Sequence, residues 1–217
     1  MFEMLPESIG RAFIHQRAGM ENVVYNLLHR ERVAALPQTV RFDLRSSAFA
    51  FNARIPARYT ADGDGISPPL SWDHIPVEAD SLALIVEDAD APTPHPLVHA
   101  IVVDLKASDG GLPEGALNSE HHRGAGLETG RNSFFKHAWL PPDPPPGHGE
   151  HRYVFQMFAL SEGPLLSQFC GRGEFIDAVL QRAVGVGCVI GTYERAPKDI
   201  EDHEDSEVVV QTSAVAT

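Results

Sequence analysis

A carboxylate and a histidine lie at the ends of two apolar runs that are neighbours in the sequence. Asp88 follows the run 82–86, and His99 lies at the start of the run 98–105. If the two runs pair as a hairpin, both side chains lie at the same end of one sheet. A histidine there can donate a hydrogen bond to an anion, more strongly once protonated. The carboxylate can orient the imidazole, hold it protonated, or accept a hydrogen bond from a ligand.

A second polar group opens the apolar run 154–160. The alternation of a strand puts His151 and Tyr153 on one face and Arg152 on the other, where we expect a structural ion pair. Tyr153 supplies a neutral O–H donor, and N–H groups of the loop around Gly147 can add more. Together these residue types suit a pocket for a small phosphomonoester-like head group.

The same residues allow other interpretations. Asp88, His99 and His151 could ligate zinc, although a carboxylate with two imidazoles forms an anion pocket equally well. A hydrolase could use either histidine as a general base beside Asp88. Enzyme motifs are poor, because the Ser133–Lys136 SxxK pattern lacks its companion motifs and no GxSxG elbow occurs. We therefore expect a binding site without catalytic residues, metal or cofactor.

Composition narrows the choice of partners and compartment. The 17 basic and 30 acidic residues give a formal charge of −13, which argues against nucleic acid or an anionic membrane as partner. The apolar runs are too short for stable membrane insertion. Two cysteines, Cys170 and Cys188, are too few for a disulfide framework, and residues 1–10 lack the pattern of a secretory signal. We expect a cytoplasmic protein.

Three regions differ in texture. We expect an N-terminal helical extension at 1–39, one β domain at 40–195, and an acidic, disordered tail at 196–217. In the extension, apolar residues at helical spacing predict one or two amphipathic helices over 5–32, with Gly19 as a break. Their apolar stripe must pack either on the domain itself or on a second copy in a homodimer.

The β domain is expected to be a mostly antiparallel sheet structure with few helices. Short apolar runs bounded by Gly, Pro and Asp indicate buried strands. A single helix is predicted over 175–184. The runs predicted as strands are 40–44, 82–86, 98–103, 154–160 and 186–193.

Five motifs together resemble the phosphatidylethanolamine-binding protein (Raf kinase inhibitor protein) family, and in particular its bacterial YbhB/YbcL branch. They span about residues 40–195 in the family's order and spacing. The motifs are Asp62-Gly63-x-Gly65-x-Ser67-Pro68-Pro69-Leu70-x-Trp72, Asp88-x-Asp90-Ala91-Pro92, His99-x-Ile101-Val102-Val103, Pro144-Pro145-x-Gly147 and Gly149-x-His151-Arg152-Tyr153-x-Phe155.

The resemblance implies a large antiparallel β-sheet packed with a smaller sheet and a few peripheral helices, with one anion-accepting pocket. Two residues depart from the family pattern: Ala89 replaces a usual proline, and Leu97 replaces a frequent aromatic residue. The implied function is binding of a small phosphate-bearing ligand, and such a binding protein could have a regulatory role. The alternative that relatives suggest is a kinase or protease inhibitor that acts through protein contacts. Carried over by position, the ligand-binding residues are Asp88, His99, Trp139, Pro145, His151 and Tyr153.

Overall fold

The computed structural model describes residues 11–13, 15–31, 39–118, 127–167 and 169–195. Within these residues the chain forms a seven-stranded sheet and a three-stranded sheet. The expected acidic tail and residues 5–10 of the expected helical segment lie outside the described residues.

The large sheet has the strand order β1-β10-β9-β5-β6-β8, and β3 also pairs with β10. Its long central strands pair antiparallel, whereas the short strands β1 and β3 run parallel to β10. Their bounds are β1 Val40–Arg41, β3 Ala53–Arg54, β5 Ser81–Asp88, β6 Leu97–Lys106, β8 Glu128–Thr129, β9 His151–Leu160 and β10 Ala183–Tyr193.

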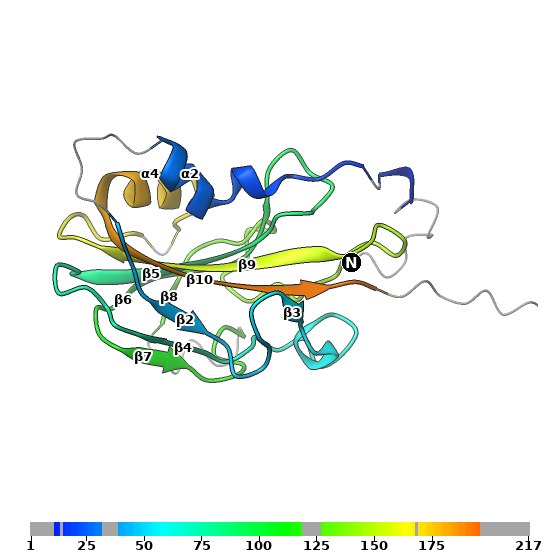
Figure 1. Cartoon of the computed structure of the whole chain (residues 1–217), viewed down its shortest axis with the longest axis horizontal. Coiled ribbons are helices and arrows are strands. Elements are labelled where there is room, and N and C mark those ends of the chain that lie inside the picture. The colour runs from blue at the N-terminus through cyan, green and yellow to red at the C-terminus, as the bar shows by residue number, and fades with distance from the viewer. Residues whose placement is uncertain (1–10, 14, 32–38, 119–126, 168, 196–217) are drawn as a thin grey trace, which may run out of the picture.

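The small sheet and the helices α2 and α4 cover opposite faces of the large sheet, giving three layers (Figure 1). The small sheet consists of β2 Asp43–Arg45, β4 Leu70–Asp73 and β7 Gly110–Leu112, all antiparallel. The helical elements are η1 Met20–Asn22, α2 Val24–Glu31, η2 Ala57–Tyr59 and α4 Arg172–Arg182. The expected mostly β fold with a large sheet, a small sheet and few helices is confirmed.

Alternation along the central strands creates two apolar cores. On β9, Tyr153 and Phe155 face the small sheet, while Phe158 and Leu160 pack against the helices. Because both faces of β9 are covered, its residues from Tyr153 onward are buried throughout. The predicted division of β9 into two faces is therefore correct.

The N-terminal segment packs on its own domain. Gly19 has a φ of 91°, which breaks the segment just before η1, and α2 follows. Val24 and Leu28 of α2 are buried in the helix-side core with Phe175 of α4. The buried part of the predicted amphipathic stripe is thus covered within the chain, whereas Phe13 is exposed.

The predicted helix over 175–184 is present with shifted ends. α4 begins at Arg172 and ends at Arg182, and the chain enters β10 at Ala183 without an intervening loop. Arg182 is fixed at this corner because its guanidinium donates to the carbonyls of Ser161 and Pro164. These bonds end the helix two residues earlier than the apolar periodicity indicates.

The loop over 130–140 runs along the outer side of β6. The N–H groups of Gly130, Ser133 and Leu140 donate to carbonyls of β6 at Ile101, Val98 and His99, respectively, with distances of 3.1, 3.0 and 2.9 Å. The two-residue strand β8, just before this loop in the chain, pairs with β6 only at Val102 and Val103. The loop therefore takes up much of the hydrogen bonding that an edge strand would otherwise provide.

Two further observations concern the described residues only. Cys170 and Cys188 are both free thiols. No helix among these residues has the length and apolar character needed to cross a bilayer.

Candidate functional site

A β-bulge aims His99 at the other site residues. Val86 on β5 pairs with Ala100 on β6, whereas the next residue, Glu87, pairs with Val98, so His99 is an extra residue on β6. Bulges of this kind bend a strand and redirect one side chain. As a result the His99 ring meets the ring of Tyr153 edge-on, with centroids 5.1 Å apart.

A cavity of about 420 Å³ lies at this end of the large sheet, and we refer to it as the principal cavity. Four of the six residues predicted for the ligand site line it: Asp88, His99, Pro145 and His151. Apolar side chains and prolines form most of the remaining wall. Those residues are Ala61, Ala91, Pro92, Leu97, Phe134, Leu140, Pro141 and Pro144, with Thr93 and Asp143 as further polar members.

Asp88 is paired with His151. The Oδ2 atom of Asp88 lies 2.8 Å from Nδ1 of His151, and Oδ1 accepts the backbone N–H of Asp90 at 2.8 Å. Both partners of the ion pair are buried. Asp88 therefore orients His151, and not His99 as one of the alternatives had it.

His99 is held by the loop opposite and presents a bare nitrogen. Its Nδ1 lies 2.6 Å from the carbonyl oxygen of Leu140, so Nδ1 carries the proton and donates. Burial lowers the pKa of His99, which favours the neutral imidazole. Nε2 is then a buried acceptor, and no hydrogen-bond partner for it occurs among the described residues. The expectation that His99 donates to an anion is therefore reversed: Nε2 accepts.

Tyr153 and Trp139 form the floor behind His99 and do not line the principal cavity. The Trp139 ring lies 6.0 Å from that of His99, and both residues are buried. Within the described structure, the Tyr153 hydroxyl and Trp139 Nε1 have no hydrogen-bond partner. Burial raises the pKa of Tyr153 well above its usual value, so the hydroxyl keeps its proton. Two buried donors thus lie unused beside His99.

His148 is a site residue that sequence reasoning missed. Its Nδ1 lies 2.6 Å from Nε2 of His151, and its own Nε2 lies 2.8 Å from the carbonyl oxygen of Phe13. Gly147 and Gly149 on either side have φ values of 75° and 90°, a conformation that suits glycine and lets the loop turn His148 inward. The sequence feature that could have pointed to His148 is its position between two glycines, three residues before His151.

The predicted ion pair of Arg152 is present on the opposite face of β9. Its guanidinium donates to both oxygens of Asp90, at 2.7 Å each, and Arg17 reaches the same carboxylate at 2.9 Å. Burial raises the pKa of Asp90, but the hydrogen bonds from Arg152 and Arg17 outweigh it and lower the pKa to about 2. Asp90 is therefore a structural anchor and does not line the principal cavity.

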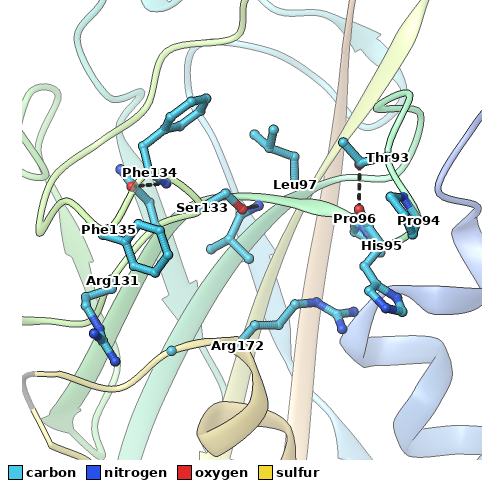
Figure 2. Close-up of a pocket in the computed structure, with 13 residues that line it drawn as sticks. Thr93, Pro94, His95, Pro96, Leu97, Arg131, Ser133, Phe134, Phe135 and Arg172 are labelled. Carbon is cyan, nitrogen blue, oxygen red and sulfur yellow. Dashed lines mark hydrogen bonds between the residues drawn. The ribbon is translucent and has the colours of Figure 1, made fainter. Parts of the chain in front are cut away.

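A second cavity of about 440 Å³ adjoins the principal one and shares Thr93, Leu97 and Phe134 with it (Figure 2). Leu97 and Phe134 both point away from Arg131 and Arg172 in this view. The loop that carries Phe134 is fixed on β6, because Ser133 Oγ accepts the N–H of Val98 at 2.8 Å. Phe134 thus supplies an aromatic wall residue, although Leu97 replaces the family's frequent aromatic one.

Among the described residues, the group with suitable spacing to coordinate a metal ion lies outside the principal cavity. The ligand atoms of Asp43, Asp73 and His74 lie within 4.8 Å of one another at the small sheet. Arg45 already pairs with both carboxylates, at 2.7 and 2.8 Å, which opposes binding of a cation there.

Comparison with known proteins agrees with the fold. The family model "phosphatidylethanolamine-binding protein" matches residues 45–194. The chain therefore belongs to the phosphatidylethanolamine-binding protein family.

Relatives come from archaea and bacteria. A UPF0098 protein of Methanothermobacter thermautotrophicus is 35% identical over 153 residues, which is 70% of this chain and 99% of that protein. CT736 of Chlamydia trachomatis, whose structure is described as that of a phosphatidylethanolamine-binding protein homologue, has a TM-score of 0.62 and 33% identity, covering 72% of this chain and 99% of that one. Escherichia coli YbcL has a TM-score of 0.66 and 24% identity, covering 71% and 98%, and shares the fold.

Proposed function

We propose that this protein binds a small phosphate-bearing ligand in the principal cavity. The observation that carries the proposal is the presence of two unused polar groups close together: an acceptor at His99 Nε2, in the lining of the cavity, and a donor at the Tyr153 hydroxyl, directly behind His99. Buried polar groups usually have partners, so an unmatched pair next to a cavity favours a polar ligand there. Hydrogen phosphate brings both complements, since P–OH donates and P–O⁻ accepts, and a phosphate monoester does so in its monoanionic form.

The mostly apolar wall supports a ligand that is small and at least partly shielded from water. Alanines, prolines, Leu97 and Phe134 surround a few polar groups, which is the usual composition of a small-molecule site. In such a site each hydrogen bond discriminates strongly, because an unmatched buried group is costly. We therefore expect the site to recognise its ligand by the pattern of hydrogen-bond donors and acceptors as well as by charge.

Sulfate and phosphate provide the sharpest test. At pH 7.5 both are mainly dianions of similar size, but only phosphate retains a proton to donate to His99 Nε2. We expect inorganic phosphate to bind in isothermal titration calorimetry, and sulfate to bind at least about tenfold more weakly. Equal affinities would contradict the acceptor role of His99. Absence of heat at millimolar concentrations of both would overturn the proposal and redirect attention to a protein partner.

Two variants locate the site. Tyr153→Phe removes one donor without changing the shape of the ring, and phosphate affinity should fall about tenfold. His74→Asn serves as the matched control, because His74 is exposed at the small sheet and its φ of 64° is one that asparagine tolerates. Its affinity should equal that of the wild type. Phosphoethanolamine, titrated next, separates a free anion from a head group.

Hydrolysis is the alternative, and one observation favours it. A neutral imidazole held by a carbonyl, with a bare Nε2 beside a cavity, is also the arrangement of a general base. Turnover of 4-nitrophenyl phosphate or acetate that is lost in His99→Gln would replace the binding proposal with this one.

A further inference from the structure

A chain of hydrogen bonds leads from the principal cavity to the N-terminal segment. Asp88 Oδ2 meets His151 Nδ1 at 2.8 Å, and His151 Nε2 meets His148 Nδ1 at 2.6 Å. His148 Nε2 then meets backbone carbonyl oxygens, at 2.8 Å for Phe13 and 3.2 Å for Gln16. All three side chains are buried.

Both ends of this chain are acceptors, and that fixes the number of protons in it. An ionised carboxylate and a carbonyl can only accept, so the three hydrogen bonds need three protons. Two neutral imidazoles bring only two. The group of Asp88, His151 and His148 therefore holds one additional proton and is neutral overall, although it contains a carboxylate.

We propose that the N-terminal strap, defined here as Phe13 and residues 15–19, sets the charge at the base of the cavity by supplying the final acceptor of this chain. Without that carbonyl, His148 could donate through Nδ1 to His151 and leave its Nε2 bare. Two protons would then suffice, and the base of the cavity would carry one negative charge. The inference rests on the proposed function in one respect, because a neutral base is what admits an anion.

The strap is tied to the same loop by independent contacts. Arg17 donates to the carbonyls of Glu150 and His148, at 2.8 and 3.2 Å. The N–H groups of Ala18 and Gly19 donate to the carbonyls of Ala91 and Ala89. The matched family region begins at residue 45, so the strap lies outside it.

The charged groups around the chain place the third proton near Asp88. Burial lowers the pKa of His148, and the neighbouring charges of His151 and Arg17 lower it further. Asp90 faces Arg17 and Arg152, which neutralise it, and His99 is neutral. His148 is accordingly a neutral relay, and the third proton lies in the pair of Asp88 and His151.

Two substitutions of similar shape test the role of His148 as a positioning residue. His148→Asn places an amide oxygen close to the position of Nδ1, so His151 keeps an acceptor for its second proton. His148→Leu removes the acceptor and leaves the volume nearly unchanged. We expect phosphate affinity at pH 7.5 to stay within about twofold in the asparagine variant and to fall about tenfold in the leucine variant.

Nuclear magnetic resonance of the full chain counts the protons directly. Ring ¹⁵N signals of His148 and His151, together with the ¹³C signal of the Asp88 carboxyl group, should reveal three protons in the wild type. In His148→Asn, which lacks the His148 ring and its proton, both ring nitrogens of His151 should stay protonated beside an ionised Asp88. In His148→Leu, His151 should have one protonated ring nitrogen beside an ionised Asp88. Only two protons in the wild type would overturn the inference. Failure of phosphate to bind the wild type would instead refute the proposed function, while the proton count still decides this inference.

Discussion

At the scale of single residues, His99 is the group whose protonation affects folding most clearly. It is buried, its Nδ1 donates to Leu140, and its Nε2 has no described partner. Burial lowers its pKa below the ordinary value of 6.5, and the unfolded chain therefore takes up a proton before the folded protein does.

This predicts a loss of stability in mild acid. Between the ordinary pKa of histidine and the lower pKa of folded His99, the unfolded state binds more protons, so stability falls as pH falls below about 6.5. Urea unfolding at a series of pH values should show this decline, and His99→Gln should make it shallower. His148 has a lowered pKa as well and keeps part of the slope in that variant. An identical slope in His99→Gln and wild type would contradict the burial of a neutral His99.

At the scale of elements, the apolar runs predicted the long strands β5, β6, β9 and β10, and alternation predicted the faces of β9. They predicted neither the short strands β3, β4, β7 and β8, nor the division of the run 40–44 between β1 and β2 in different sheets, nor the bulge in β6. The alternation of His151, Arg152 and Tyr153 is a local property of the sequence, and the structure preserves it. The extra residue at His99 depends on pairing with β5 and on the loop at Leu140, which no local pattern records. For the same reason the contact between Asp88 and His151 and the relay through His148 were not predictable.

A buried carboxylate joins the central sheet to both main helices. Glu87 of β5 accepts hydrogen bonds from the N–H of Val24, at the start of α2, and from the side chain of Gln156. Its other oxygen lies 2.7 Å from Nε of Arg172, the first residue of α4. Glu87 thus fixes the beginnings of both helices on one strand, and a negative charge suits a helix N-terminus.

Removing the Arg172 side chain alone should destabilise the protein more than removing both charges of the Arg172–Glu87 ion pair. Arg172→Met leaves Glu87 buried with its charge uncompensated, and we expect a loss of roughly 3 kcal/mol in the free energy of unfolding. Adding Glu87→Gln to that variant should restore part of the loss. Denaturant unfolding of both variants and the wild type gives the comparison. If the double variant were less stable than Arg172→Met alone, the carboxylate would have a different main role.

At the scale of the whole molecule, the layered β architecture was predictable from short apolar runs and the five motifs, whereas the placement of the N-terminal segment was left open. Its helical spacing fitted packing on the domain or on a second copy. Val24 and Leu28 are buried against α4 and the sheet, because the helix-side face of β5 and β9 would otherwise be uncovered. Light scattering of the full chain tests the homodimer alternative. A monomeric mass would refute it, and a dimer would have to use surface other than these two side chains.

The loop over 130–140 has a consequence for how other chains can approach. Its N–H groups already bond the carbonyls of Val98, His99 and Ile101, and the two-residue strand β8, just before the loop in the chain, pairs with Val102 and Val103. An incoming strand would have to strip this loop away before it could extend β6. Central strands as apolar as β5 and β6 would otherwise template aggregation, which natural sheets avoid by blocking their edges. The loop that holds His99 in place thus also protects the protein against amyloid-like growth along β6.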